Sequence, residues 1–99
     1  MSVLKLLINK LEENPSLENF EETFQFCINF EYKTENEELQ LISTVQQALE
    51  RVRINTDLFS FFVDNQTIEL LCKKFGKKVL ELVKNQEWPN VINSIELTI

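Results

Sequence analysis

The side chains with the most chemistry to offer in this sequence are two cysteines and a large number of carboxylates. Cys27 and Cys72 stand far apart among apolar neighbours without CxxC spacing, so we interpret them as reduced thiols of the core. The chain has no histidine and a single glycine, Gly76. Ser-His and Cys-His nucleophiles, Cys/His zinc sites and glycine-rich phosphate loops are therefore excluded. We expect a protein without catalytic residues, metal or cofactor.

The carboxylates are concentrated in the first half of the chain. Sixteen Asp and Glu against ten Lys and Arg give a net charge of -6 over 99 residues. Residues 1–50 carry ten acidic and three basic side chains, whereas residues 51–99 carry six and seven. Between residues 12 and 38, nine glutamates surround Lys33 as the one cation. Such a field repels nucleic acid and anionic membranes and attracts basic surfaces, unless it only keeps a small protein in solution.

Aromatic side chains lie within and beside the acidic stretch. If residues 24–32 are helical, three of these aromatics fall off the main apolar stripe, and we expect them to be partly exposed instead of buried in the core. An acidic rim around aromatic anchors is typical of interface hot spots. The predicted partner-binding residues are Glu18, Glu21, Glu22, Glu31, Glu35, Glu37, Glu38, Phe26, Phe30 and Tyr32.

A second charged group consists of lysines on the expected last helix. Their spacing places them opposite its apolar stripe, at Lys73, Lys74, Lys77 and Lys78. No aromatic residue shares their face, because Phe75 between them belongs to the apolar stripe, and single-stranded nucleic acid is usually bound by lysines that alternate with aromatics. We therefore interpret the four lysines as an ordinary solvated face and expect no direct binding of nucleic acid.

Most of the chain that carries these charged and aromatic residues shows the periodicity of α-helices. Apolar residues recur at helical spacing over residues 3–12, and a second helix follows a Ser16 cap to about residue 23. Capping-box spacing at residues 34–37 introduces a third helix over residues 35–53. The apolar run at residues 58–63 is predicted to be buried, but it is too short for its shape to be assigned.

The remaining segments are compatible with more than one secondary structure. A long helix is predicted to begin at Asp64 or Asn65 and to end before Trp88, and Gly76 inside it is either tolerated or a break. Residues 24–32 fit both helical spacing and a strand-like alternation, and the best strand partner is the alternating segment 91–99.

These patterns favour a mainly α protein with one small helical domain of about four to five helices over residues 1–99. The alternative fold is α+β, with strands near 24–32 and 91–99. No stretch has the length and apolarity of a membrane helix or the features of a signal peptide, so we expect a cytoplasmic protein.

In character the chain resembles small acidic proteins that neutralise basic targets, namely toxin immunity proteins, antitoxins and phage-type inhibitors of nucleases or nucleic-acid-binding proteins. The resemblance implies a non-catalytic protein-binding module that covers a basic surface of its partner. The alternative is a structural or adaptor subunit that docks through an apolar patch, with the acidity serving solubility. The identity of the partner and the oligomeric state stay open at this point.

Overall fold

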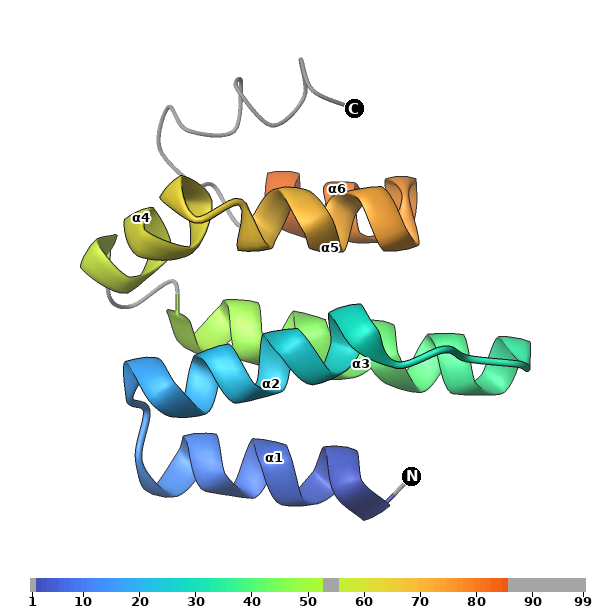
Figure 1. Ribbon diagram of the computed structural model, residues 1–99, viewed down its shortest axis with the longest axis horizontal. Helices are drawn as coiled ribbons and strands as arrows, with labels where there is room; N and C mark the ends of the chain where they lie inside the picture. Colours follow the sequence, from blue (N-terminus) through green and yellow to red (C-terminus); the bar gives the residue numbers. More distant parts are fainter. Residues whose placement is uncertain (1, 53–55, 86–99) are drawn as a thin grey trace.

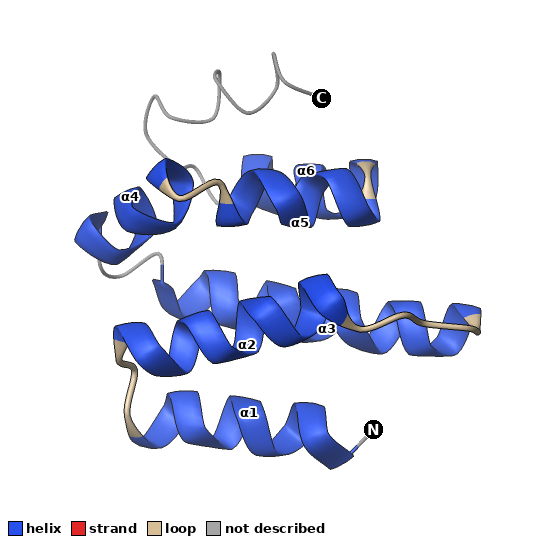
Figure 2. Ribbon diagram, in the orientation of Figure 1, coloured by secondary structure: helices blue, strands red, loops and turns tan. Residues whose placement is uncertain are grey.

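A computed structural model describes residues 2–52 and 56–85 of the chain (Figure 1). Within this part every regular element is an α-helix, and Figure 2 shows only short loops between them. The predicted mainly helical domain is confirmed. The six helices are α1 (Ser2–Glu13), α2 (Leu17–Asn29), α3 (Glu35–Val52), α4 (Thr56–Asp64), α5 (Thr67–Phe75) and α6 (Lys77–Asn85).

The helices pack in two groups that meet at α2 and α3. The first three helices pack on one another, and α5 and α6 lie on the other side of α2 and α3 (Figure 1). The short helix α4 connects the two groups and packs against α3 and α5. Helix α1 is an outer helix. In the described part of the chain, its extensive contacts are with α2 and α3.

The core is built from the apolar stripe that each helix turns inward. At one end, Phe20 and Phe24 of α2 surround Phe62 of α4, with ring centroids 5.0 to 6.3 Å apart and all three side chains buried. Edge-to-face aromatic pairs of this kind add to the free energy gained by burial alone. Other fully buried large side chains of the core are Leu11, Leu41, Val45, Leu49, Val52, Ile68, Leu71, Val79 and Val83.

The ambiguous segment 24–32 is helical up to Asn29. Phe24 and Cys27 are buried at helical spacing, and the chain becomes extended at Phe30 without pairing to a strand among the described residues. The alternative strand at 24–32 is therefore wrong, and its suggested partner 91–99 lies outside the described residues. The helix buries Phe24 and Cys27 completely, and Phe26, Ile28, Phe30 and Tyr32 pack partly buried against the core.

Gly76 breaks the expected long helix into α5 and α6. Its φ of 67° and ψ of -142° are not helical, and its N–H still donates to the carbonyl oxygen of Cys72 over 2.7 Å. Glycine reaches this backbone conformation without the steric penalty that a Cβ imposes. The break accounts for a sixth helix, and the unassigned apolar run 58–63 lies within α4.

Candidate functional site

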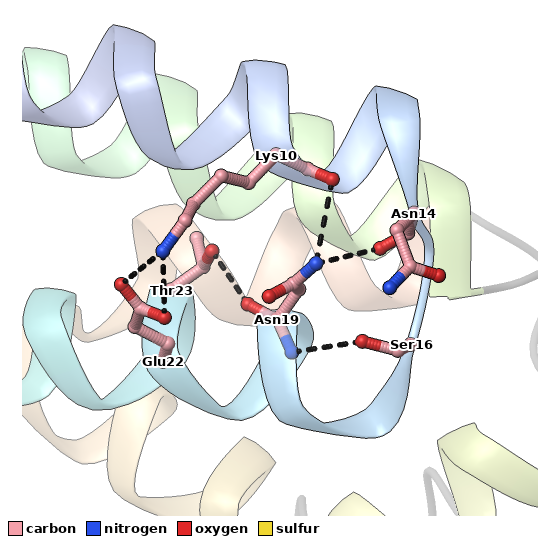
Figure 3. Close-up of polar contacts among 6 residues, drawn as sticks. All are labelled: Lys10, Asn14, Ser16, Asn19, Glu22 and Thr23. Atoms are coloured by element: carbon pink, nitrogen blue, oxygen red, sulfur yellow. Dashed lines mark hydrogen bonds and ion pairs between the residues drawn. The ribbon is translucent and has the colours of Figure 1, made fainter.

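The turn between α1 and α2 is fixed by a small network of polar contacts (Figure 3). Ser16 caps α2 by accepting a hydrogen bond from the backbone N–H of Asn19 over 3.3 Å. The Asn19 side-chain amide donates to the carbonyl oxygens of Asn14 (2.8 Å) and Lys10 (3.4 Å), which belong to the end of α1 and the turn. These bonds hold the two antiparallel helices in one relative position, and this position sets the shape of the surface between them.

An apolar groove of about 790 Å³ runs between α1 and α2 on the outer surface. Two apolar lining residues on α1 are exposed to solvent: Leu6 is 61% exposed and Val3 is 41% exposed. The aromatic rings of Phe26 and Phe30 lie opposite, 5.5 Å apart between centroids and partly buried. Among the described residues, the groove is lined by Val3, Leu6, Leu7, Lys10, Glu22, Gln25, Phe26, Asn29 and Phe30.

One end of the groove is crossed by an ion pair. Lys10 Nζ lies 3.1 Å from Glu22 Oε1 and also contacts the second carboxylate oxygen at 3.2 Å (Figure 3). Both side chains are about half exposed, at 54% and 50%, so the pair contributes little to stability. The pair matters for the charge of the groove. Lys10 is the one cation among the described lining residues, and Glu22 neutralises it.

Further carboxylates flank this groove. Glu18 and Glu21 each lie one helical turn before a lining residue of α2, Glu22 and Gln25 respectively, and both are exposed. Glu13, at the end of α1, is also exposed. Within residues 2–52 and 56–85, none of these three glutamates has an ion-pair partner. The flank therefore carries uncompensated negative charge beside exposed apolar side chains.

The structure divides the seven predicted glutamates between different environments. Glu22 pairs with Lys10 in the groove, and Glu37 accepts hydrogen bonds from the backbone N–H groups of Lys33 and Thr34 at the start of α3. Glu37 thus completes the predicted capping box, because its own N–H donates to Thr34 Oγ1 over 3.1 Å. The exposed remainder splits into Glu18 and Glu21 beside the groove and Glu31 and Glu35 near the α2–α3 connection.

Glu38 and Tyr32 belong to an internal contact instead of the groove. Lys78 of α6 donates to Glu38 Oε1 over 2.5 Å, and the Tyr32 ring stacks on Phe75 of α5 with centroids 6.2 Å apart. The hydrogen bond from Lys78 lowers the pKa of Glu38, and the hydrogen bond with Glu38 raises the pKa of both Lys78 and Tyr32. This cluster joins the two helix groups, so of the three predicted aromatic anchors only Phe26 and Phe30 line the groove.

Lys74 departs from the predicted solvated face of lysines. Its ammonium group donates to the carbonyl oxygens of Cys27 (2.6 Å), Ile28 (2.8 Å) and Phe30 at the end of α2. The prediction is wrong for this residue because the carbonyls at a helix C-terminus lack intrahelical donors and carry partial negative charge. Among its neighbours, Lys73 pairs with Glu69 on the surface and Lys78 pairs with Glu38.

The two cysteines are free and fully buried. Burial raises the pKa of Cys27 to about 12 and that of Cys72 to about 11, so both stay protonated at neutral pH. Over the described ranges, no three His, Cys, Asp or Glu side chains come together in a way that could hold a metal ion. In the same part of the chain, no helix has both the length and the apolarity needed to cross a bilayer.

Comparisons with protein-family models, with curated proteins and with solved structures found no match to this chain. The site is therefore interpreted from its geometry alone. Sequence reasoning missed the α1 wall of the groove, and the signal was present at Leu6. This leucine lies off the stripe formed by Leu4, Leu7 and Leu11, so together with Val3 it places apolar side chains on the exposed face of α1.

Proposed function

We propose that this chain is a non-catalytic protein-binding module that holds a basic protein against the α1–α2 groove. The observation that carries the proposal is the juxtaposition of exposed apolar side chains, above all Leu6, with the carboxylates of Glu18 and Glu21, which have no ion-pair partner among the described residues. Apolar anchors surrounded by charge are the usual composition of a protein interface, with a buried centre and a polar rim.

In this proposal the two parts of the surface have different tasks. Side chains of the partner that fill the groove remove Leu6 and Phe26 from water and thereby supply most of the affinity. The carboxylates, together with the net charge of -6, speed the encounter with a basic surface and disfavour acidic competitors.

A basic surface covered in this way is no longer accessible to nucleic acid. The proposed biological role is therefore neutralisation of a nuclease or a nucleic-acid-binding protein, as an immunity protein, an antitoxin or a phage-type inhibitor performs it. We place this role in the cytoplasm, and the two free thiols support a reducing compartment.

The second candidate function is an adaptor subunit that docks through the same groove. It is favoured by the apolar character of the groove lining and by the 61% exposure of Leu6. The two candidates differ in the role of charge, because an adaptor docked by apolar contacts binds equally well at low and high salt. A partner attracted by the carboxylates associates more slowly as salt rises.

The test is affinity capture from the native cell's lysate, with parallel washes at low and high salt. We expect a basic protein that elutes with salt and that binds poorly to Leu6→Ser and to the double variant Glu18→Lys/Glu21→Lys. The matched controls are Leu39→Ser and Glu81→Lys, which change an exposed leucine of α3 and an exposed glutamate of α6 away from the groove. Both controls should bind like the unaltered chain.

Either of two results would contradict the proposal. If the captured protein binds both groove variants as tightly as the controls, the groove is not the binding surface. If binding depends on Leu6 but changes neither with salt concentration nor in the variant Glu18→Lys/Glu21→Lys, the protein is an adaptor subunit and does not neutralise a basic target.

A further inference from the structure

We infer that the occupant of the α1–α2 groove is an amphipathic helix of the partner, with basic residues beside its apolar stripe. This inference rests on the proposed function and specifies the chemistry of the partner at the same site. Three properties of the groove carry it: the nature of its walls, its length and the distribution of charge around it.

The walls of the groove are formed by α1 and α2, whose backbone groups are bonded within each helix except at the helix ends. An extended segment laid into the groove would find few backbone partners for its own N–H and C=O groups. Leaving such groups unpaired in an apolar site is unfavourable, whereas a helix satisfies them within itself. The groove also has the arrangement that a third helix occupies when it packs on an antiparallel helix pair.

The length of the lining matches two turns of helix. The lining residues extend from Val3 to Lys10 on α1 and from Glu22 to Asn29 on α2, with Phe30 directly after α2. At about 1.5 Å per residue these stretches measure roughly 10 to 12 Å, the distance between positions i and i+7 of a helix. The occupant therefore presents three apolar side chains, at i, at i+3 or i+4, and at i+7.

Charge complementarity selects a basic occupant over a second copy of this chain. Lys10 is the one cation of the lining and is paired with Glu22, while Glu13, Glu18 and Glu21 flank the groove without ion-pair partners in the described part of the chain. A second copy docked through the same face would bring its own carboxylates toward these. Lysine or arginine residues next to the apolar stripe of the occupant would instead meet opposite charge.

The test uses two displayed peptide libraries as probes against the folded full-length chain. One library fixes helical spacing of apolar positions, the other fixes strand-like alternation, and both randomise the remaining positions among basic, acidic and neutral residues. We expect enrichment from the helical library, with Lys or Arg beside the apolar stripe. Selected peptides should lose about ten-fold in affinity on Leu6→Ser, the loss that accompanies removal of one buried leucine anchor, and little on Leu39→Ser.

The outcomes separate this inference from the proposed function. Groove-dependent binders from the strand-like library, or acidic helical ones, would overturn the inference while leaving a peptide-binding groove in place. If neither library yields a binder that is sensitive to Leu6→Ser, both the inference and the proposed function fail. Sedimentation of the unaltered chain measures its oligomeric state. A dimer that dissociates in the Leu6→Ser variant would overturn the inference, because the groove would then bind a second copy of this chain.

Discussion

The ammonium nitrogen of Lys74 lies 2.6 Å from the carbonyl oxygen of Cys27, so a side chain of α5 caps the C-terminus of α2 across 47 positions of sequence. The same nitrogen lies 5.8 Å from the centroid of the Tyr32 ring and 5.4 Å from that of Phe75. Carbonyl oxygens and aromatic faces both attract a cation, and together they hold Lys74 in place although burial lowers its pKa. This contact fixes where α2 ends and therefore where Phe30, at one end of the groove, is located.

Replacing Lys74 with methionine keeps much of the aliphatic stem and removes the cation. We expect Lys74→Met to lower the free energy of unfolding by about 1–3 kcal/mol, because partly buried carbonyl oxygens lose their donor. Urea unfolding followed by circular dichroism measures the loss. Lys73→Met is the matched control, since the contact of Lys73 in the described part of the chain is an ion pair with Glu69 at a half-exposed ammonium, and it should change stability by less than about 0.5 kcal/mol. Equal losses in both variants would show that the cap does not stabilise the fold.

The ion pair between Glu38 and Lys78 gives stability a defined dependence on pH. Because the pKa of Glu38 is lowered below the ordinary value of 4.5, the carboxylate stabilises the fold above that value. This contribution is lost as the pH falls through the lowered pKa. Tyr32, whose pKa is raised above 10.0, contributes below that value, and its contribution is lost as the pH rises through the raised pKa.

We therefore expect Glu38→Gln to be less stable than the unaltered chain at pH 7, with the difference closing below pH 4.5. Urea unfolding at intervals from pH 3 to 8 measures it. Glu21→Gln removes an exposed carboxylate without an ion-pair partner in the described ranges, and it should show a smaller difference at pH 7. A Glu38→Gln deficit that stays constant down to pH 3 would contradict the assigned role of the carboxylate.

The break between α5 and α6 depends on backbone conformation more than on space. A Cβ at Gly76 would meet no atom within 4 Å, but its φ of 67° and ψ of -142° are almost restricted to glycine. We expect Gly76→Ala to reduce the free energy of unfolding by about 1–3 kcal/mol. Gln66 also has a positive φ, 63°, and Gln66→Gly should leave stability within about 1 kcal/mol or raise it. An alanine at position 76 without a stability loss would mean that the two helices join into one.

The thiols of Cys27 and Cys72 should be unreactive in the folded chain. Both are buried, and their raised pKa values leave almost no thiolate at pH 8. With Ellman's reagent at pH 8, we expect both thiols to react promptly in urea and neither to react promptly in native buffer. A fast reaction under native conditions would place at least one of the thiols at the surface.

Substitutions at Leu6 and Leu11 of α1 should differ in their effect on the free energy of unfolding. Leu6 is 61% exposed, so Leu6→Ser should change the free energy of unfolding by no more than about 0.5 kcal/mol. Leu11 is 1% exposed, and Leu11→Ala should reduce it by about 2–5 kcal/mol. Urea unfolding measures both. If Leu6→Ser destabilises as much as Leu11→Ala, the groove is part of the core and loss of binding could not be assigned to a contact.

Much of this fold was predictable because buried stripes recur at helical spacing. The stripe through Leu4, Leu7 and Leu11 gave α1, and the capping box at Thr34 gave the start of α3 at Glu35. The segment after residue 23 was not predictable, because its aromatic residues satisfy two periods at once. Only the tertiary contacts of Phe24 and Cys27 decide for a helix.

The candidate site was predictable only in part, for a physical reason. Sequence identifies carboxylates and aromatics, but ion pairs such as Glu38 with Lys78 join residues 40 positions apart and depend on how helices pack. The same holds for Lys74, whose carbonyl partners belong to another helix. Phe26 and Phe30 were correctly expected to be partly exposed, whereas Val3 and Leu6 complete the groove only once α1 is placed against α2.

Because α1 is an outer helix, its residues fall into two sets, one that faces the core and one that faces outward. Positions such as Leu4, Ile8 and Leu11 face the core, whereas Val3, Leu6 and Lys10 line the groove. Substitutions at the second set change the exposed groove surface and leave the core contacts of α1 in place. If the groove binds a protein as proposed, a few substitutions on α1 would change which partner fits while the scaffold beneath stays constant.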